Sequence, residues 1–238
     1  MSSLIRLAET KNLPYNQYMD QETLDWIISN KIIDNDSLQL YLDSEDFQML
    51  QSRCIPSGWF LSSERIGSIH GARHLLRVAI NGLNLIRVGF ASPSLHKIII
   101  VSSILHDLKR ACDKDDPKHA IRAAKWFKEN INEVERVFFP LSIQDKNSIY
   151  YSILLHELNL EDASNNFFYQ KYKDAIDLLK ISDALDRYRL PKLKWWPNLD
   201  MLPKQLPKDS LWFAYQLVIR SEQRSLEGLD DYSSVFDK

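Results

Sequence analysis

The sequence predicts an all-α protein. Apolar residues recur at intervals of three and four along most of the chain, whereas the alternation of apolar and polar residues that marks half-buried strands is scarce. Only six of the 238 residues are glycine, which is well below the average usage of about 7%. The low glycine content disfavours folds that are built on many tight turns, and we therefore expect a bundle of helices.

The N-terminal part predicts a helical extension. Residues 21–32 place their apolar side chains on one face of a helix. Asp36 and Ser37 can cap a second helix. Residues 55–58 read Ile-Pro-Ser-Gly, and this sequence is expected to end the extension.

A longer helix is expected to begin near Ser68, a residue type that often caps helix N-termini. His70 and His74 would then lie on one face of this helix, because residues at i and i+4 are neighbours on its surface. Gly82 and Gly89 are expected to loosen or end it.

Two further helices are expected in the central part. The first begins at residues 92–94, Ser-Pro-Ser, since proline suits the first turn of a helix. Its apolar face runs through residues 95–105 and ends at His106. Asp116 is expected to cap the next helix, and Pro117 to open it.

The remaining sequence predicts three more helices and one loop. Helical patterns cover residues 146–158, 169–188 and 211–224. Residues 190–210 hold four of the nine prolines, so this stretch is expected to be a loop. We divide the chain into a helical N-terminal extension, a central core, and a proline-rich loop with a C-terminal helix that packs on the core: residues 1–57, 58–190 and 191–238.

The composition excludes several classes of protein. A net charge of -2 gives no sequence-wide surface for nucleic acid or a membrane, and no run approaches the ~20 apolar residues of a membrane span. Glycine-rich phosphate loops are also absent from the sequence. Cys54 and Cys112 are too few for a disulfide framework, and the N-terminus lacks a signal peptide. We expect a cytoplasmic protein with reduced thiols.

The strongest candidate for a functional site is the doublet His106-Asp107. It closes the apolar run 98–105, so both side chains are expected to be buried. An imidazole and a carboxylate are costly to bury together unless another charge compensates them. A divalent metal ion provides this compensation and takes nitrogen and oxygen ligands from several segments. His74 lies upstream of the doublet, and Asp183 lies downstream in another apolar stretch.

With these four residues in this order, the chain resembles the HD-domain superfamily of metal-dependent phosphohydrolases. Members have a His in the pattern H-x-x-R-V, then a His-Asp doublet and a distal Asp. The matching positions here are His74, His106, Asp107 and Asp183, and the resemblance covers roughly residues 64–190. It implies an HD-domain helical bundle in which these four side chains bind a divalent ion. It also implies hydrolysis of a small phosphate ester, and we expect a nucleotide.

The resemblance leaves the number of metal ions open. Two imidazoles and two carboxylates suit Mn²⁺, Fe²⁺, Co²⁺, Ni²⁺ or Zn²⁺ better than Ca²⁺, with Mg²⁺ also open. Some HD families carry two extra histidines that hold a second ion, with the doublet Asp as a bridge. His119 and His156 fall in similar places, so Asp107, His119 and His156 are candidates for a second site. Alternatively, these two histidines bind the substrate phosphate or orient the ligands. We expect His70 to support a ligand or to transfer a proton.

Three cations are candidates for binding a substrate phosphate. Lys109 and Arg110 directly follow the doublet, and Arg187 follows Asp183. Lys109 and Arg110 could instead complement a helix dipole. For Arg187, a surface pair with Asp186 is the favoured alternative. The general base is not identified by the sequence.

The sequence also predicts roles for Arg77 and for two adjacent tryptophans. We expect Arg77 to pair with a carboxylate in the core rather than to touch the substrate. Trp195 and Trp196 are suited to stacking on a nucleobase, but tryptophans in such a loop more often pack it onto the body of the protein.

Several other functions remain open at this point. An oxygenase of the HD type would use a di-iron centre on the same ligands, and a non-catalytic regulatory module would bind metal without turnover. A nuclease is disfavoured by the near-neutral charge. A ppGpp hydrolase is disfavoured because Lys109 and Arg110 stand where an acidic pair is expected. The two flanking segments could set substrate choice or form a homo-oligomer.

Overall fold

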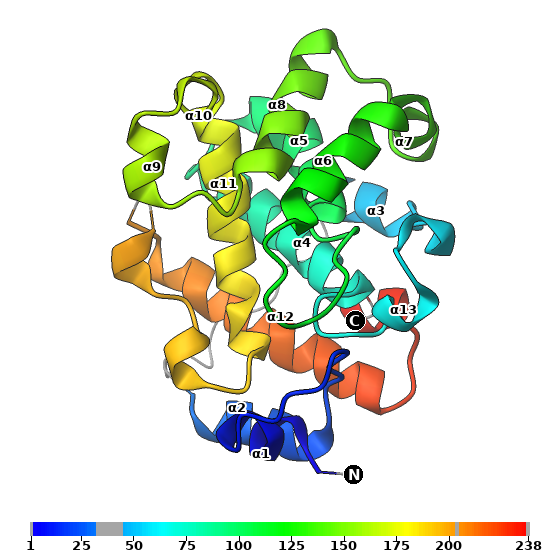
Figure 1. The fold of residues 1–238 in the computed structure, drawn as a ribbon, viewed down its shortest axis with the longest axis vertical. Coiled ribbons are helices and arrows are strands. Elements are labelled where there is room, and N and C mark those ends of the chain that lie inside the picture. The colour runs from blue at the N-terminus through cyan, green and yellow to red at the C-terminus, as the bar shows by residue number, and fades with distance from the viewer. Residues whose placement is uncertain (1, 32–44, 203–204, 237–238) are drawn as a thin grey trace.

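The computed structural model describes residues 2–31, 45–202 and 205–236. Its regular secondary structure is helical throughout these ranges, which confirms the predicted all-α class (Figure 1). The α-helices are α1 Leu4–Glu9, α2 Gln21–Ser29, α3 Glu45–Gln51, α4 Ala72–Arg87, α5 His96–Leu105, α6 His119–Glu129, α7 Ile131–Val137, α8 Ile143–Leu155, α9 Leu160–Ser164, α10 Phe167–Lys171, α11 Lys173–Leu185, α12 Lys208–Leu226 and α13 Asp231–Phe236. The short 3-10 helices are η1 Ser57–Trp59, η2 Ser63–Arg65, η3 Pro93–Leu95, η4 Asp186–Arg189, η5 Leu193–Trp195 and η6 Leu199–Met201.

Helix α4 is the central element of the bundle. It packs against α5, α11, α12 and α13, and Figure 1 shows it near the middle of the molecule. Every residue from 72 to 86 is buried, including the polar ones. The charged side chains of α4 must therefore find their partners inside the protein, since a buried charge without a partner is strongly unfavourable.

The two flanking parts of the chain pack on the same core as the central part. Leu24 of the extension, Ile80 of α4 and Trp212 of α12 belong to one cluster of buried side chains. Helix α2 lies against α12, where the Tyr215 hydroxyl donates to the Ile27 carbonyl at 2.9 Å. None of the described helices is both long and apolar enough to cross a lipid bilayer.

The start of α4 differs from the prediction. The helix begins at Ala72 with Gly71 as its N-cap, so Ser68 and His70 precede it in a turn. Gly82 lies inside the helix and does not end it. A Cβ atom at Gly82 would lie only 2.2 Å from Cγ1 of Ile99, so this glycine allows α5 to pack closely. Gly89 ends the helix as expected, with a φ of 75°.

Other boundaries were also wrong. The pattern over residues 169–188 is divided at Tyr172 into α10 and α11, and it ends in η4. Asp116 does not cap α6, because its carboxylate instead accepts the Ala111 backbone N–H at 2.7 Å. Helix α8 begins after a capping box at Ser142, earlier than predicted. The start predicted for the second helix of the extension lies outside the described residues.

Replacing Gly71 by alanine is expected to destabilise the protein. A Cβ atom there would lie 2.0 Å from the backbone oxygen of Ile66 and 2.4 Å from that of Arg65. Relief of such overlap typically costs about 1–3 kcal/mol, which urea denaturation can measure. Gly58→Ala is the matched control, because nothing lies within 4 Å of its Cβ position. Equal stability of the two variants would contradict this packing argument.

Candidate metal centre

The four predicted ligands meet at one point in the structure. His74 comes from α4, His106 and Asp107 from the end of α5, and Asp183 from α11. His74 Nε2 lies 3.6 Å from Asp107 Oδ2 and 3.5 Å from Asp183 Oδ1, and His106 Nε2 lies 3.8 Å from Asp183 Oδ1. Atoms that each lie about 2.0–2.2 Å from one ion are separated by similar distances. The donor set therefore has a geometry that could hold a metal ion.

Hydrogen bonds fix the orientation of both imidazoles. His74 Nδ1 donates to Asp186 Oδ2 at 2.7 Å, and His106 Nδ1 donates to the Ser103 carbonyl at 2.7 Å. In the neutral form of either ring Nε2 is then an acceptor, and neither Nε2 has a hydrogen-bond partner among the described residues although both are buried. Such orphaned acceptors are costly, and the arrangement is the usual one for metal-binding histidines.

A second cluster shares Asp107 with the first. His119 Nε2 lies 2.9 Å from Asp107 Oδ1 and 3.2 Å from His156 Nε2. Their Nδ1 atoms donate to the carbonyls of Asp116 and Ile153, each at 2.7 Å. Asp107 thus turns one carboxylate oxygen to each cluster, and both groups have a geometry that could hold an ion. This is the bridged arrangement of the second-metal alternative.

The facing nitrogens of the second cluster need a cation between them. Two imidazole lone pairs at this distance repel unless a proton or a metal ion separates them. Burial lowers the pKa of His156 to about 3, with help from the nearby His106 and His119. Burial also opposes protonation of His119, but the Asp107 carboxylate outweighs it and raises the pKa of His119 to about 9. Without metal, His119 therefore carries the proton.

Both carboxylates of the centre are ionised. Burial alone would raise the pKa of Asp107, but Arg110, His119 and His106 hold it well below its usual range. The pKa of Asp183 is likewise held well below its usual range, because His106 outweighs the effect of burial. The Asp183 side chain is 30% exposed, so the centre opens to solvent on this side.

A network of buried charges lies on the Nδ1 side of the His74 ring. Asp186 receives Arg77 Nε at 2.6 Å and pairs with Arg189 Nη1 at 3.2 Å. Arg77 Nη1 also donates to Glu222 of α12 at 2.6 Å, which confirms the predicted pairing of Arg77 with a core carboxylate. The expected surface pair between Asp186 and Arg187 was wrong, because Asp186 is fully buried.

His70 lies beside the centre rather than in it. Its Nδ1 is 2.8 Å from Asp113 Oδ1, and Asp113 also receives Arg65 at 2.7 Å and the Gln17 backbone N–H at 2.7 Å. Burial, together with Arg110 and Arg189, lowers the pKa of His70 to about 3. The imidazole is therefore neutral at pH 7 and can accept a proton only transiently.

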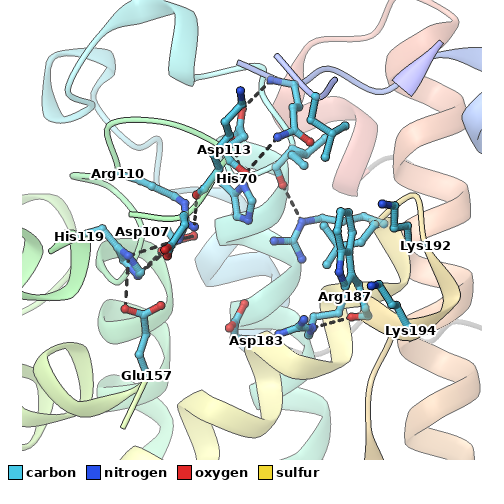
Figure 2. A pocket seen from close by; sticks show the side chains of 18 of the residues that line it. His70, Asp107, Arg110, Asp113, His119, Glu157, Asp183, Arg187, Lys192 and Lys194 are labelled. Carbon is cyan, nitrogen blue, oxygen red and sulfur yellow. Dashed lines mark hydrogen bonds and ion pairs between the residues drawn. The ribbon is translucent and has the colours of Figure 1, made fainter. Parts of the chain in front are cut away.

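A cavity of about 790 Å³ lies over the centre. Asp107, His119, His156 and Asp183 line it together with Arg110, Arg187 and Trp195, and Figure 2 shows Arg110 and Arg187 on opposite sides of this site. Arg110 Nη1 contacts Asp107 Oδ1 at 3.3 Å.

Lys109 points away from the cavity. Its ammonium group donates to the Trp59 carbonyl and lies 4.7 Å from the centre of the Trp126 ring. Of the two cations that follow the doublet, only Arg110 lines the cavity. Trp196 is buried against the rings of Trp26 and Tyr188, so it packs the loop onto the body.

The carboxylates that surround the ligands were the main omission from the sequence analysis. Asp186 offered one signal, since it follows Asp183 at i+3 and so shares its helical face. Glu222 offered none, because only the packing of α12 on α4 brings it to Arg77.

Comparisons of the chain with protein-family models, with curated proteins and with solved structures find no match. The resemblance to the HD superfamily remains a prediction from the sequence.

Asp186→Asn is expected to weaken metal binding by about 10- to 100-fold, the usual effect of losing such a supporting contact. The amide keeps the shape of the carboxylate but not its charge, so it holds the His74 Nδ1–H less firmly. Titration calorimetry with Zn²⁺ or Mn²⁺ measures the change. Glu222→Gln is the control, since it removes a charge from Arg77 without touching His74. Equal weakening in both variants would show that the contact with His74 is not the cause.

His70 should make the metal-free protein less stable in acid. Because the folded pKa of about 3 is below the ordinary 6.5, the unfolded chain binds more protons between these pH values. The contribution of neutral His70 is complete above pH 6.5 and falls by up to about 1.4 kcal/mol per pH unit as the pH decreases. His70→Gln should flatten this dependence in urea denaturation at pH 7, 6 and 5. An unchanged slope, matching that of the control His96→Gln, would refute the assignment.

Proposed function

We propose that this protein is a metal-dependent phosphohydrolase that acts on a small phosphate ester, and that its substrate is a nucleotide. The observation that carries the proposal is the position of Asp107, whose two oxygens face two clusters of buried imidazoles beneath one cavity. A pair of divalent ions held there would activate water and stabilise the attacking and leaving oxygens.

The chain's own residues prepare the site for an anion. The four ligand imidazoles are held with Nδ1 anchored, so no side chain has to reorient when the site is filled. Arg110 lies on the Asp107 carboxylate and brings positive charge to the edge of the centre. This arrangement suits the negative charge of a phosphate group.

Two other residues on the cavity wall fit the proposed reaction. Neutral His70, oriented by Asp113, is placed to relay a proton from the cavity. Trp195 is only partly buried and lines the cavity, and its ring is suited to stacking on the base of a nucleotide.

Metal content tests the two-cluster arrangement directly. The wild-type protein should retain two equivalents of Mn²⁺ or Zn²⁺ in elemental analysis. His156→Ala should retain one, because it removes a ligand from the second cluster alone. Asp107→Ala should retain none, because the bridging carboxylate serves both clusters. An Asp107→Ala protein that still binds two ions would refute the bridged centre.

A phosphate-release screen over nucleotides with Mn²⁺, Co²⁺ and Mg²⁺ tests the activity itself. His106→Ala and Asp107→Ala should abolish turnover, and activity in either variant would reject the assignment.

The bridged geometry also suits the second candidate, a di-iron oxygenase, because a shared carboxylate and histidine ligands are equally appropriate for two irons. Oxygen consumption by the iron-loaded protein, without phosphate release, would select this function.

A further inference from the structure

We propose that the cavity binds a second phosphoryl group of the substrate, away from the metal centre. The site is a cationic strip formed by Arg187, Lys192 and Lys194. The substrate class is then a nucleotide with two phosphoryl groups, either a diphosphate or a bisphosphate. This inference rests on the proposed function for the identity of the phosphate that is cleaved.

The side-chain contacts of Arg187 and Lys192 are with neutral groups of Trp195. Arg187 Nε donates to the Trp195 carbonyl at 2.6 Å, and Lys192 lies 4.7 Å from the centre of the Trp195 ring. Within the described ranges, no carboxylate forms an ion pair with any of the three cations. By contrast, Arg110 and Arg189, which line the same cavity, pair with Asp107 and Asp186. Three cations held together without a counter-charge repel one another, and a bound anion relieves this repulsion.

The strip lies on the far side of Asp183 from the rest of the candidate metal centre. Arg187 follows Asp183 by one turn, and Figure 2 shows the strip on the opposite side of Asp183 from Asp107 and His119. A phosphate at the metal centre and an anion at the strip would thus lie on the two sides of Asp183. The cavity volume of about 790 Å³ is in the range for an organic ligand and exceeds the needs of one phosphate group.

A neighbouring cavity of about 810 Å³ shares five lining residues with the first: His156, Glu157, Asp183, Arg187 and Lys194. Lys192 lines only the first cavity, so this cavity is the one that all three cations of the strip face. The second phosphoryl group is therefore placed on the side of the strip that faces the first cavity.

The backbone that carries Lys192 and Lys194 is held in place by contacts within the protein, before any anion binds. Trp196 is buried, donates from Nε1 to the Leu190 carbonyl at 2.8 Å, and packs edge-on against Trp26 and Tyr188. The turn of η5 between Lys192 and Trp195 is closed by a backbone hydrogen bond of 2.9 Å. A site built on such an anchored segment loses little entropy when an anion binds, which favours affinity.

Pyrophosphate binding to the metal-free protein tests the strip independently of catalysis. Titration calorimetry should show binding to the wild type and at least tenfold weaker binding to the Lys192→Gln/Lys194→Gln variant. The matched control is Lys125→Gln/Lys128→Gln on α6, which removes the same charge outside the cavity and should bind as the wild type does. Equal affinity in both double variants, or no binding to the wild type, would overturn the proposal.

Turnover by the Mn²⁺-loaded protein provides the second test. The ratio of kcat/KM for adenosine 3′,5′-bisphosphate or adenosine 5′-diphosphate to that for adenosine 5′-monophosphate should exceed one. It should fall at least tenfold in Lys192→Gln/Lys194→Gln. Hydrolysis with an unchanged ratio would overturn the strip but leave the proposed function intact. Tenfold weaker pyrophosphate binding without any hydrolysis would support the strip and reject the hydrolase.

Discussion

Compensation of buried charge along α4 is the constraint on which this structure depends. Arg77 is fully buried, yet Asp186 and Glu222 outweigh the effect of burial and raise its pKa. Burial opposes ionisation of Asp186 as well, but Arg77 and Arg189 lower its pKa to about 2. Removing any partner would leave an uncompensated charge in the core, which costs about 3–5 kcal/mol. Helix α12 must therefore lie against α4 for an electrostatic reason as well as an apolar one, and the fold of the C-terminal segment is tied to the orientation of His74.

The sequence was sufficient to predict the class of fold and to single out side chains that the structure brings together. Helical periodicity is a local property of the sequence. The helices that it predicted are present as α2, α4, α5 and α8, although their ends differ from the predicted ones. The ligands were recognisable because a histidine or aspartate at the end of an apolar run must be buried and must then be compensated. His106 and Asp107 satisfy that condition in the structure, with exposures of 0% and 5%.

What the sequence could not provide was the direction of side chains beyond helix ends. Lys109 and Arg110 are adjacent, but α5 has ended and the chain turns, so one side chain packs on Trp126 and the other lies on Asp107. His70 was expected on α4 because its spacing from His74 is helical. The close packing of Gly71 on the carbonyl of Ile66 instead places the N-cap after His70. Such outcomes depend on contacts between segments, which no local pattern encodes.

The positions of the candidate ligands near helix ends have a physical cause. The last carbonyls of a helix lack intrahelical donors. His106 and His156 are the C-cap residues of α5 and α8, and each donates its Nδ1–H to the carbonyl three residues earlier. One hydrogen bond thus satisfies a helix carbonyl and also fixes the ring with Nε2 turned toward the shared Asp107. His74 instead lies in the first turn of α4, and the carbonyl three residues before it, that of Gly71, already accepts the Leu75 backbone N–H at 3.1 Å. Its Nδ1–H is therefore donated to a carboxylate from another segment, Asp186. This difference explains why Asp186 and its arginines are required behind His74 and have no counterpart behind His106 or His156.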